Sequence, residues 1–203
     1  RSLLKHPFYV KWNAGELTMD DMQVYAKEYF QLAKRVPGIV ARVLERAGDR
    51  DPAMKAMIEE NIREEHEHVE LWKRFACSVG VSNKELESYV PSAKVNEAVS
   101  ELEAVADGTF EDGVTAMYSM EKELPEIAQT KKDGLCKFYG LTSEDAHIYF
   151  DEHLGEEKHL RVWMTVDLNE STARIAAEKS LAAQNKVLDA VCDLAGIDME
   201  CGC

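Results

Sequence analysis

Acidic residues and histidines are grouped at helical spacing at several places in this chain. Residues three or four apart on a helix share a face, so Glu64 or Glu65 can point the same way as His68. Carboxylates and imidazoles that converge from several helices of a bundle form di-iron and di-manganese sites. Such a site implies redox chemistry with oxygen rather than binding alone. The other candidate ligands of this kind are Glu121, His153, Glu156 and His159.

The histidines support a metal site more strongly than the carboxylates do. His153, Glu156 and His159 fall within about a third of the circumference of one helix, at about 100° per residue. Together with His66 and His68, the two histidines just named make four of the six in the chain. Acidic residues number 38 of 203, so acid–histidine neighbours also arise by chance, and a solvated acidic helix face is the alternative. Carboxylates with imidazoles suit iron or manganese, and no set of cysteines suggests structural zinc.

The composition is that of an ordinary soluble globular protein, with 45% hydrophobic and 31% charged residues. The net charge of −14 disfavours nucleic acid and anionic membranes as partners, because both attract a basic surface. No apolar run approaches the ~20 residues of a membrane helix, and no signal peptide is visible. The five cysteines are irregularly spaced, unlike a secreted disulfide framework, so we expect a cytoplasmic protein.

Helical patterns cover nearly the whole chain and predict an all-α bundle of seven helices. We expect a single domain over residues 1–197, followed by a Cys-containing tail over residues 198–203. Pro37 should break the first long helix, and Pro125 should bend a later helix just after Glu121. The expected helices are residues 17–48, 52–79, a short turn after 82, 96–106, 110–132, a short piece within 134–140, one that begins at 142 and carries His153 to His159, and 173–195.

A set of short segments spread over the chain is informative as a group. They are residues 6–12 (HPFYVKW), 15–18 (GELT), 25–29 (YAKEY), 71–72 (LW), 118–121 (YSME), 125–128 (PEIA), 149–150 (YF) and 152–153 (EH). In order and flanks they resemble the heme-oxygenase-like di-metal oxidase family, and within it the chlamydial death-domain-associating proteins and their bacterial relatives. The likeness covers almost the whole chain and implies the heme-oxygenase-like (TenA/PqqC-like) bundle.

The resemblance also implies a cofactor: two metal ions, iron with iron or iron with manganese, with dioxygen as co-substrate. The interval before His68 is shorter than in the family, which leaves Glu64 and Glu65 both open as the first carboxylate. His153 lies one residue closer to its acid than in the family, which leaves Glu156 and Glu157 both open. The ligands carried over by position are Glu64 or Glu65, His68, Glu121, His153, Glu156 and His159.

The resemblance implies a reaction as well, because relatives in this branch make para-aminobenzoate (4-aminobenzoate), a folate precursor, at the expense of their own side chains. By position, Tyr9 is the source of the ring and Lys131 is the amino donor, so each chain would turn over about once. The alternatives are a core tyrosine and a solvated lysine, and Lys132 competes for the second role. Tyr25 is a further catalytic candidate, lining the pocket or relaying an electron with Tyr29, with packing as the alternative.

Three other functions remain open at this stage. An oxidase that acts on an external small molecule would use the same metal ligands and turn over more than once per chain. A thiaminase-like reaction needs a cysteine nucleophile, for which Cys136 is the mid-chain candidate, and an inert thiol is the alternative. A non-enzymatic interaction module would not need the ligands at all. If the protein is an oxidase, we expect it to need an external reductant as partner. The resemblance also implies a homodimer.

Overall fold

The computed structural model describes residues 2–155 and 157–198, and this part of the chain contains helices without any β-strand. The all-α prediction is therefore confirmed, and the helices outnumber the seven expected because several predicted helices are divided. The helical elements are η1 (Leu3–Lys5), α1 (Pro7–Ala14), α2 (Met19–Ala33), α3 (Val36–Glu45), α4 (Pro52–Ser78), α5 (Asn83–Ser88), α6 (Ala93–Ala106), α7 (Phe110–Glu121), α8 (Leu124–Tyr139), α9 (Glu144–Glu152), η2 (His153–Gly155), α10 (Glu157–Met164) and α11 (Glu170–Ala195).

The helices begin where the sequence supplies capping side chains. Thr18 and Asp21 form a capping box at the start of α2, and Asp51 caps α4 with Pro52 in its first turn. Ser92 caps α6 three residues earlier than expected, and Asn169 caps α11. Because each cap satisfies backbone N–H groups that would otherwise lack partners, these side chains fix the helix starts.

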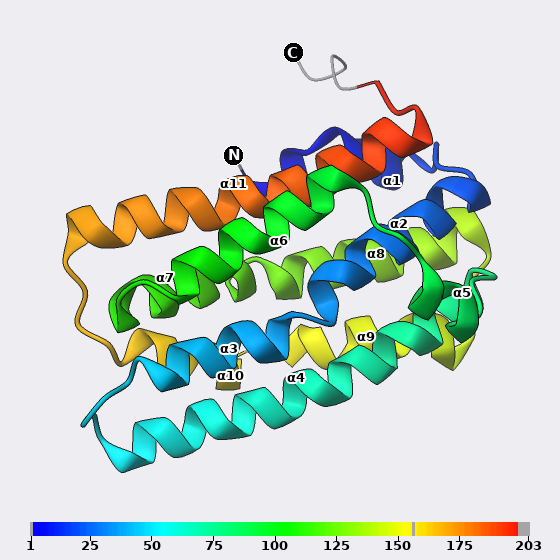
Figure 1. The fold of residues 1–203 in the computed structure, drawn as a ribbon. Coiled ribbons are helices and arrows are strands. Elements are labelled where there is room, and N and C mark those ends of the chain that lie inside the picture. The colour runs from blue at the N-terminus through cyan, green and yellow to red at the C-terminus, as the bar shows by residue number, and fades with distance from the viewer. Residues whose placement is uncertain (1, 156, 199–203) are drawn as a thin grey trace.

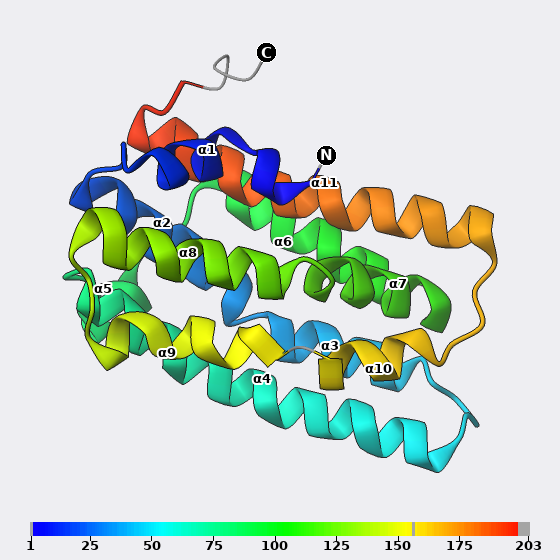
Figure 2. The ribbon, with the colours of Figure 1, turned by 180° about the vertical axis from the view of Figure 1, so that it is seen from behind.

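Three helices are divided near the middle of the bundle (Figures 1 and 2). The α2–α3 and α7–α8 divisions precede Pro37 and Pro125, which lie in the first turns of α3 and α8. Residues 110–132 thus form two helices rather than one bent helix. The expected separation between the helix over residues 110–132 and a short piece within 134–140 was wrong, because α8 runs without a break through Gly134 to Tyr139.

The third division corrects the sequence prediction directly. His153 and His159 were expected on one regular helix, but α9 ends at Glu152 and His153 begins a 3-10 turn that reaches Gly155. His159 then lies on α10. Gly155 is the last residue of this turn, and glycine destabilises a continuous helix because its backbone is conformationally free. Glu156, also predicted as a ligand, lies outside the described residues.

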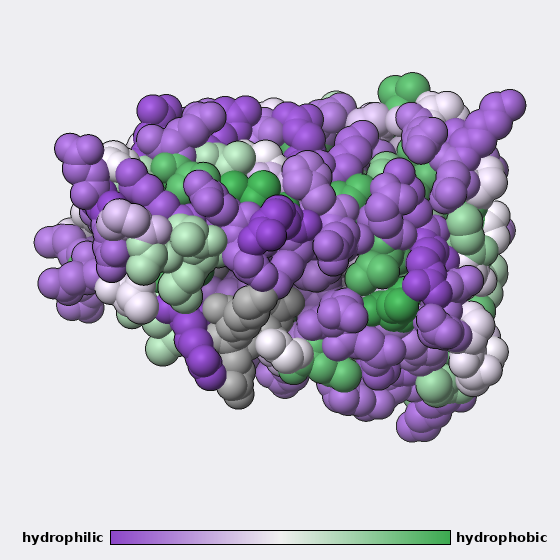
Figure 3. Space-filling model, turned by 90° about the horizontal axis from the view of Figure 1, so that it is seen from below, coloured by the Kyte–Doolittle hydropathy of each residue, from purple (hydrophilic) through white to green (hydrophobic). Residues whose placement is uncertain are grey.

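The divided helices lie between two long continuous ones. Figure 1 shows α11 along one edge of the bundle and α4 along the opposite edge. The face on which α4 lies, seen from below in Figure 3, is mainly hydrophilic, with apolar side chains only in small separate groups. Nowhere in the described ranges is a helix both long enough and apolar enough to span a membrane. The prediction of one domain over residues 1–197 stays a prediction, and most of the tail lies outside the described residues.

Candidate metal centre and its tyrosine–lysine neighbour

The first ligands come from α4, which turns one face into the core. Glu65 and His68 are buried on this face, and the nearest oxygen and nitrogen of the two side chains are 3.4 Å apart. His66 and Glu67 are exposed, as expected for residues on the opposite face. Glu64 lies at the margin and is partly exposed. The acid–histidine stretch therefore contributes Glu65 and His68 to the core and His66 and Glu67 to the solvent-exposed surface.

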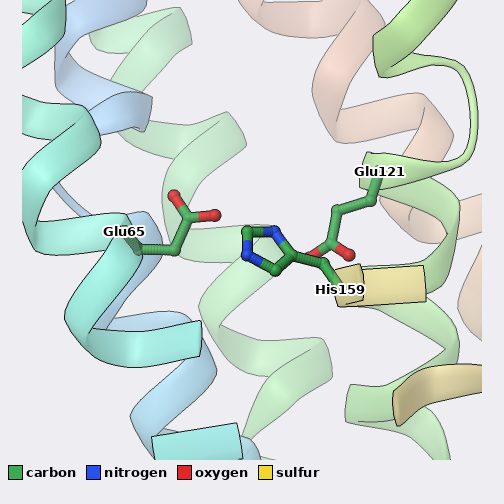
Figure 4. A group of neighbouring side chains, drawn as sticks. All are labelled: Glu65, Glu121 and His159. Atoms are coloured by element: carbon green, nitrogen blue, oxygen red, sulfur yellow. The ribbon is translucent and has the colours of Figure 1, made fainter. Parts of the chain in front are cut away.

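Helices α7 and α10 bring two more predicted ligands to Glu65. Glu121 is the last residue of α7, and each of Glu65, Glu121 and His159 offers a ligand atom within 4.8 Å of the others. Figure 4 shows these three side chains pointing toward one another from α4, α7 and α10. Trp163, one turn after His159, donates a hydrogen bond from its indole N–H to Glu121 at 2.7 Å, which orients that carboxylate. The sequence analysis missed Trp163, although its spacing of four from His159 was visible.

The third histidine predicted as a ligand, His153, joins the same group. Its ring centroid is 4.5 Å from that of His68, and the His68 and His159 centroids are 6.0 Å apart. The Nδ1 of His153 is 2.6 Å from the backbone oxygen of Tyr149. Because a carbonyl oxygen only accepts hydrogen bonds, Nδ1 carries the proton and Nε2 keeps the lone pair that a metal would use.

Glu64 and Glu65 occupy different places in this group. Glu65 is in the core beside Glu121, whereas the Glu64 carboxylate is 2.5 Å from Nε2 of His159 at the edge. Burial alone would raise the pKa of Glu65, but the hydrogen bond with His68 and the electrostatic interactions with His68, His153 and His159 lower it. The carboxylate is therefore ionised, which is the form that binds metal.

The donor set fits a pair of divalent cations of the kind predicted. The described residues bring two core carboxylates and three imidazoles together, with Glu64 beside them, and thiolates are absent from the group. Carboxylates with imidazoles match iron and manganese. The ligands come from four separate elements of a helical bundle, as in carboxylate-bridged metal sites.

The predicted reacting residues lie together elsewhere in the core. Lys131 on α8 is 2% exposed and donates a hydrogen bond from Nζ to the hydroxyl of Tyr25 on α2. The same Nζ is 5.5 Å from the ring centroid of Tyr9 on α1 and 5.0 Å from that of Tyr29. Lys132, in contrast, is partly exposed and pairs with Asp151. The structure thus brings together the three predicted residues and separates the two neighbouring lysines.

Burial changes the protonation of these groups. Loss of hydration lowers the pKa of Lys131 from 10.5 to about 7, so a large fraction of the amine is neutral near neutral pH. The pKa values of Tyr9 and Tyr25 are raised well above 10, chiefly by the same burial, so both phenols are protonated. A neutral amine is a nucleophile, and an ammonium ion is not.

An aromatic layer connects the two regions. Trp72, one turn after His68 on α4, stacks on Tyr29 with ring centroids 4.7 Å apart. It also meets Tyr149 edge-on at 4.7 Å, and the Tyr149 centroid is 4.4 Å from that of His153. Burial, and after it the nearby charge of Glu65, raises the pKa of Tyr29 to about 12. The carboxylate–histidine group and the tyrosine–lysine group are thus joined by contacting rings.

Cys136, the alternative nucleophile, lies apart from both groups. It is exposed, and its sulfur is 3.6 Å from Nε2 of His147. The same Nε2 is 2.8 Å from the backbone oxygen of Leu141 and therefore carries a proton. That nitrogen does not accept a proton from the thiol, so the geometry gives no support to a thiaminase-like activation of Cys136.

The helical arrangement and the buried ligands define a class of protein, and comparison with known proteins identifies it. The chain belongs to the TENA/THI-4/PQQC family, whose model matches residues 1–195. Among solved structures it resembles a heme-oxygenase-like domain from Shewanella denitrificans, with a TM-score of 0.79, 16% identity, and coverage of 98% of this chain and 88% of the other. A CADD-like protein from Nostoc punctiforme gives a TM-score of 0.74 at 15% identity over 93% and 85% of the two chains. The predicted fold is confirmed.

Within this family, the chain is similar to several proteins that share one enzyme name. The chain is 33% identical to 4-aminobenzoate synthase of Chlamydia muridarum over 192 residues, which cover 92% of this chain and 80% of the relative. It is 35% identical to 4-aminobenzoate synthase of Chlamydia trachomatis over 79% of this chain and 70% of the relative. A third relative of the same name, from Nitrosomonas europaea, is 30% identical over 94% and 83%. The family resemblance seen in the sequence is confirmed.

Proposed function

We propose that this chain is an oxygen-dependent 4-aminobenzoate synthase that uses Tyr9 as the source of the ring and Lys131 as the amino donor. The observation that supports this most is the buried contact of the Lys131 amine with Tyr25, beside the ring of Tyr9. The names of the relatives supply the product. The side chain of a tyrosine contains the seven carbons of aminobenzoate, with oxygen in place of nitrogen on the ring.

The metal ligands proposed for this reaction are Glu65, His68, Glu121, His153 and His159, with Glu64 and Glu156 as further candidates. Two iron ions, or iron with manganese, bound there would supply oxidation by dioxygen, with electrons from an external reductant. Converting the side chain requires that the Cα–Cβ bond of Tyr9 breaks and that dioxygen oxidises Cβ to the carboxylate carbon. A bond also forms between the ring and Nζ of Lys131, the phenol oxygen leaves as water, and the Cε–Nζ bond of Lys131 breaks to release the product. Each chain would make the product about once, because Tyr9 is consumed.

The residues around Tyr9 and Lys131 would assist this conversion by holding the amine in place, setting its protonation and excluding water. Tyr25 accepts the hydrogen bond of Lys131 and so holds the amine among the rings. Burial keeps much of the Lys131 amine neutral and Tyr9 protonated, so that the amine can attack an oxidised ring. The surrounding aromatic rings, including Phe150 and Trp72, exclude water from the amine.

The test uses protein in which tyrosine carries an isotope label. Purified protein is given reductant, ferrous iron with or without manganese, and air, and the small molecules are examined by mass spectrometry. We expect labelled 4-aminobenzoate and a matching loss of mass from the peptide that contains Tyr9. The Tyr9→Phe variant should bind metal normally and release none. Labelled product from Tyr9→Phe would disprove the role of Tyr9.

A second candidate function is supported by the openings beside the metal ligands. Two pockets reach Glu64 and His159 from the surface, one of about 400 Å³ and one of about 340 Å³. Either has room for a small external substrate, which an oxidase would turn over repeatedly. More than one product molecule per chain would favour this function over the self-sacrificing one. The homodimer implied by the resemblance stays a prediction.

A further inference from the structure

Asn61 is a buried amide that neither the fold nor the proposed reaction explains. It lies on α4 with 1% of its surface exposed. Within the part of the chain that the structure describes, neither its Nδ2 nor its Oδ1 has a hydrogen-bond partner. A buried amide without a partner destabilises the folded state, because it has lost its hydrogen bonds to water. Asparagine is also a poor helix former in a helix interior, so local structure gives no reason for it.

The position of Asn61 connects it with the metal ligands. It precedes Glu65 by four residues and His68 by seven, so all three share the inward face of α4. It also lines the larger of the two pockets beside the ligands, together with Glu64 and His159. Asn61 therefore lies where this pocket meets the predicted centre.

We propose that Asn61 positions a small exogenous ligand of the metals, an anion or a water molecule that comes through this pocket. The inference rests on the proposed function only in requiring that the centre binds metal. Nδ2 can donate a hydrogen bond to a metal-bound anion, and Oδ1 can accept one from a metal-bound water. A ligand of this class satisfies an amide that the protein itself leaves without a partner. Asn61 is thus a positioning residue and not one of the metal ligands.

Azide is a suitable probe, because it is a small anion whose binding to oxidised iron gives a visible absorption band. Iron-loaded, oxidised protein is titrated with azide, and the dissociation constant is compared with that of Asn61→Leu. We expect Asn61→Leu to bind the same amount of iron and to bind azide about tenfold more weakly, as for the loss of one hydrogen bond to a charged group. Glu152→Gln, which alters an exposed carboxylate in the smaller pocket, is the control and should leave azide affinity unchanged.

Several results would overturn the proposal. Equal azide affinity in wild type and Asn61→Leu would show that the amide does not contact the ligand. Loss of iron from Asn61→Leu would make Asn61 a metal ligand instead. A loss of affinity in Glu152→Gln as large as in Asn61→Leu would place the route in the other pocket. Azide affinity and iron content can be measured whether or not the protein makes aminobenzoate. A failure of the proposed reaction would therefore not be mistaken for a failure of this proposal.

A measurement on metal-free protein tests the same idea without any ligand. If the amide has no structural partner, Asn61→Leu should raise the midpoint temperature of unfolding by a few degrees, because it removes a buried polar group. A lower midpoint would show that the fold itself uses the amide and would overturn the proposal. This result stands even if wild-type protein binds no iron.

Discussion

The carboxylate–histidine group and the tyrosine–lysine group are both buried, but the first stabilises an ionised side chain and the second disfavours ionisation. Glu65 keeps its negative charge in the core because His68, His153 and His159 surround it, and its pKa is lowered. Lys131 has aromatic rings around it instead of a carboxylate, and its pKa falls to about 7. The first region therefore stabilises a negative charge and suits cations, whereas the second disfavours a positive charge and leaves much of the amine neutral near neutral pH.

The largest effect should come from removing one charge in the carboxylate–histidine group. Glu121→Gln keeps the size of the side chain and an oxygen that can accept from Trp163, but removes the negative charge at the meeting point of α7 and α10. We expect loss of metal binding at one site or both, and no detectable aminobenzoate. Metal content by elemental analysis, with product by mass spectrometry, checks this.

The control for this variant is Glu126→Gln, which changes an exposed carboxylate in the first turn of α8. It should retain both metal and product. Full metal content in Glu121→Gln would contradict a ligand role for Glu121. Loss of metal in both variants alike would indicate a general effect of charge rather than coordination.

The next effect separates the two regions. Lys131→Met keeps an unbranched side chain in the aromatic core and removes the amine, so product should fall at least a hundredfold while metal content stays unchanged. Lys132→Met is a matched control, because Lys132 is the adjacent residue but pairs with Asp151 near the surface. It should still yield product. Product from Lys131→Met, or its loss only in Lys132→Met, would transfer the donor role to the other lysine.

A third prediction concerns pH and follows from the lowered pKa of Lys131. The unfolded chain holds this proton up to about pH 10.5 and the folded chain only to about 7. Between these values the unfolded state binds more protons, so the free energy of unfolding should rise with pH, by up to about 1.4 kcal/mol per unit from this residue. Below about pH 7 the residue is protonated in both states and adds no slope.

The measurement is urea denaturation of metal-free wild type and Lys131→Met between about pH 7.5 and 9.5. Other titrating groups affect both proteins, so the difference between the two curves isolates Lys131. We expect Lys131→Met to have the larger free energy of unfolding near pH 7.5, and we expect its excess over wild type to decrease steadily as pH rises. Parallel curves would mean that the amine is hydrated or paired in the folded protein.

The two regions also differ in how far the sequence predicts them. The spacing of Glu64 or Glu65 from His68 on one helix face is a local property. It left both carboxylates open, and the structure buries Glu65 with His68 while Glu64 is partly exposed. The burial of Lys131 beside a partly exposed Lys132 depends on how α8 packs on α1 and α2, which no local pattern contains. The resemblance supplied that residue, and the structure shows that it is buried and that its pKa is lowered.

Errors in the sequence analysis have a similar cause. Periodicity predicted an all-helical chain well, but it placed His153 and His159 on one helix, because a single Gly155 is tolerated in a helical pattern. Tertiary contacts decide the division there: His153 turns toward His68, and His159 toward Glu121. Asn61 was missed although its spacing from Glu65 was visible, since an amide is not expected as a metal ligand.

The smallest predicted effect tests what holds the tyrosine–lysine group together. Gly134 on α8 touches Trp12 on α1, and a Cβ at this position would lie 2.4 Å from the indole nitrogen. Gly134→Ala should therefore push α1, which carries Tyr9, away from α8, which carries Lys131. We expect a loss of about 1–3 kcal/mol in the free energy of unfolding. Product should decrease while metal content stays unchanged, because no metal ligand lies on α1 or α8.

A glycine elsewhere provides the comparison. Gly38 lies in α3, and a Cβ there would meet no atom within 4 Å, so Gly38→Ala should leave stability equal or raise it by up to about 1 kcal/mol. Urea denaturation and metal analysis of both variants separate the outcomes. If Gly134→Ala lost metal together with product, the two regions would depend on the same packing. If it lost only product, the distance between Tyr9 and Lys131 would be set by helix packing alone, independently of the ligands that build the metal centre.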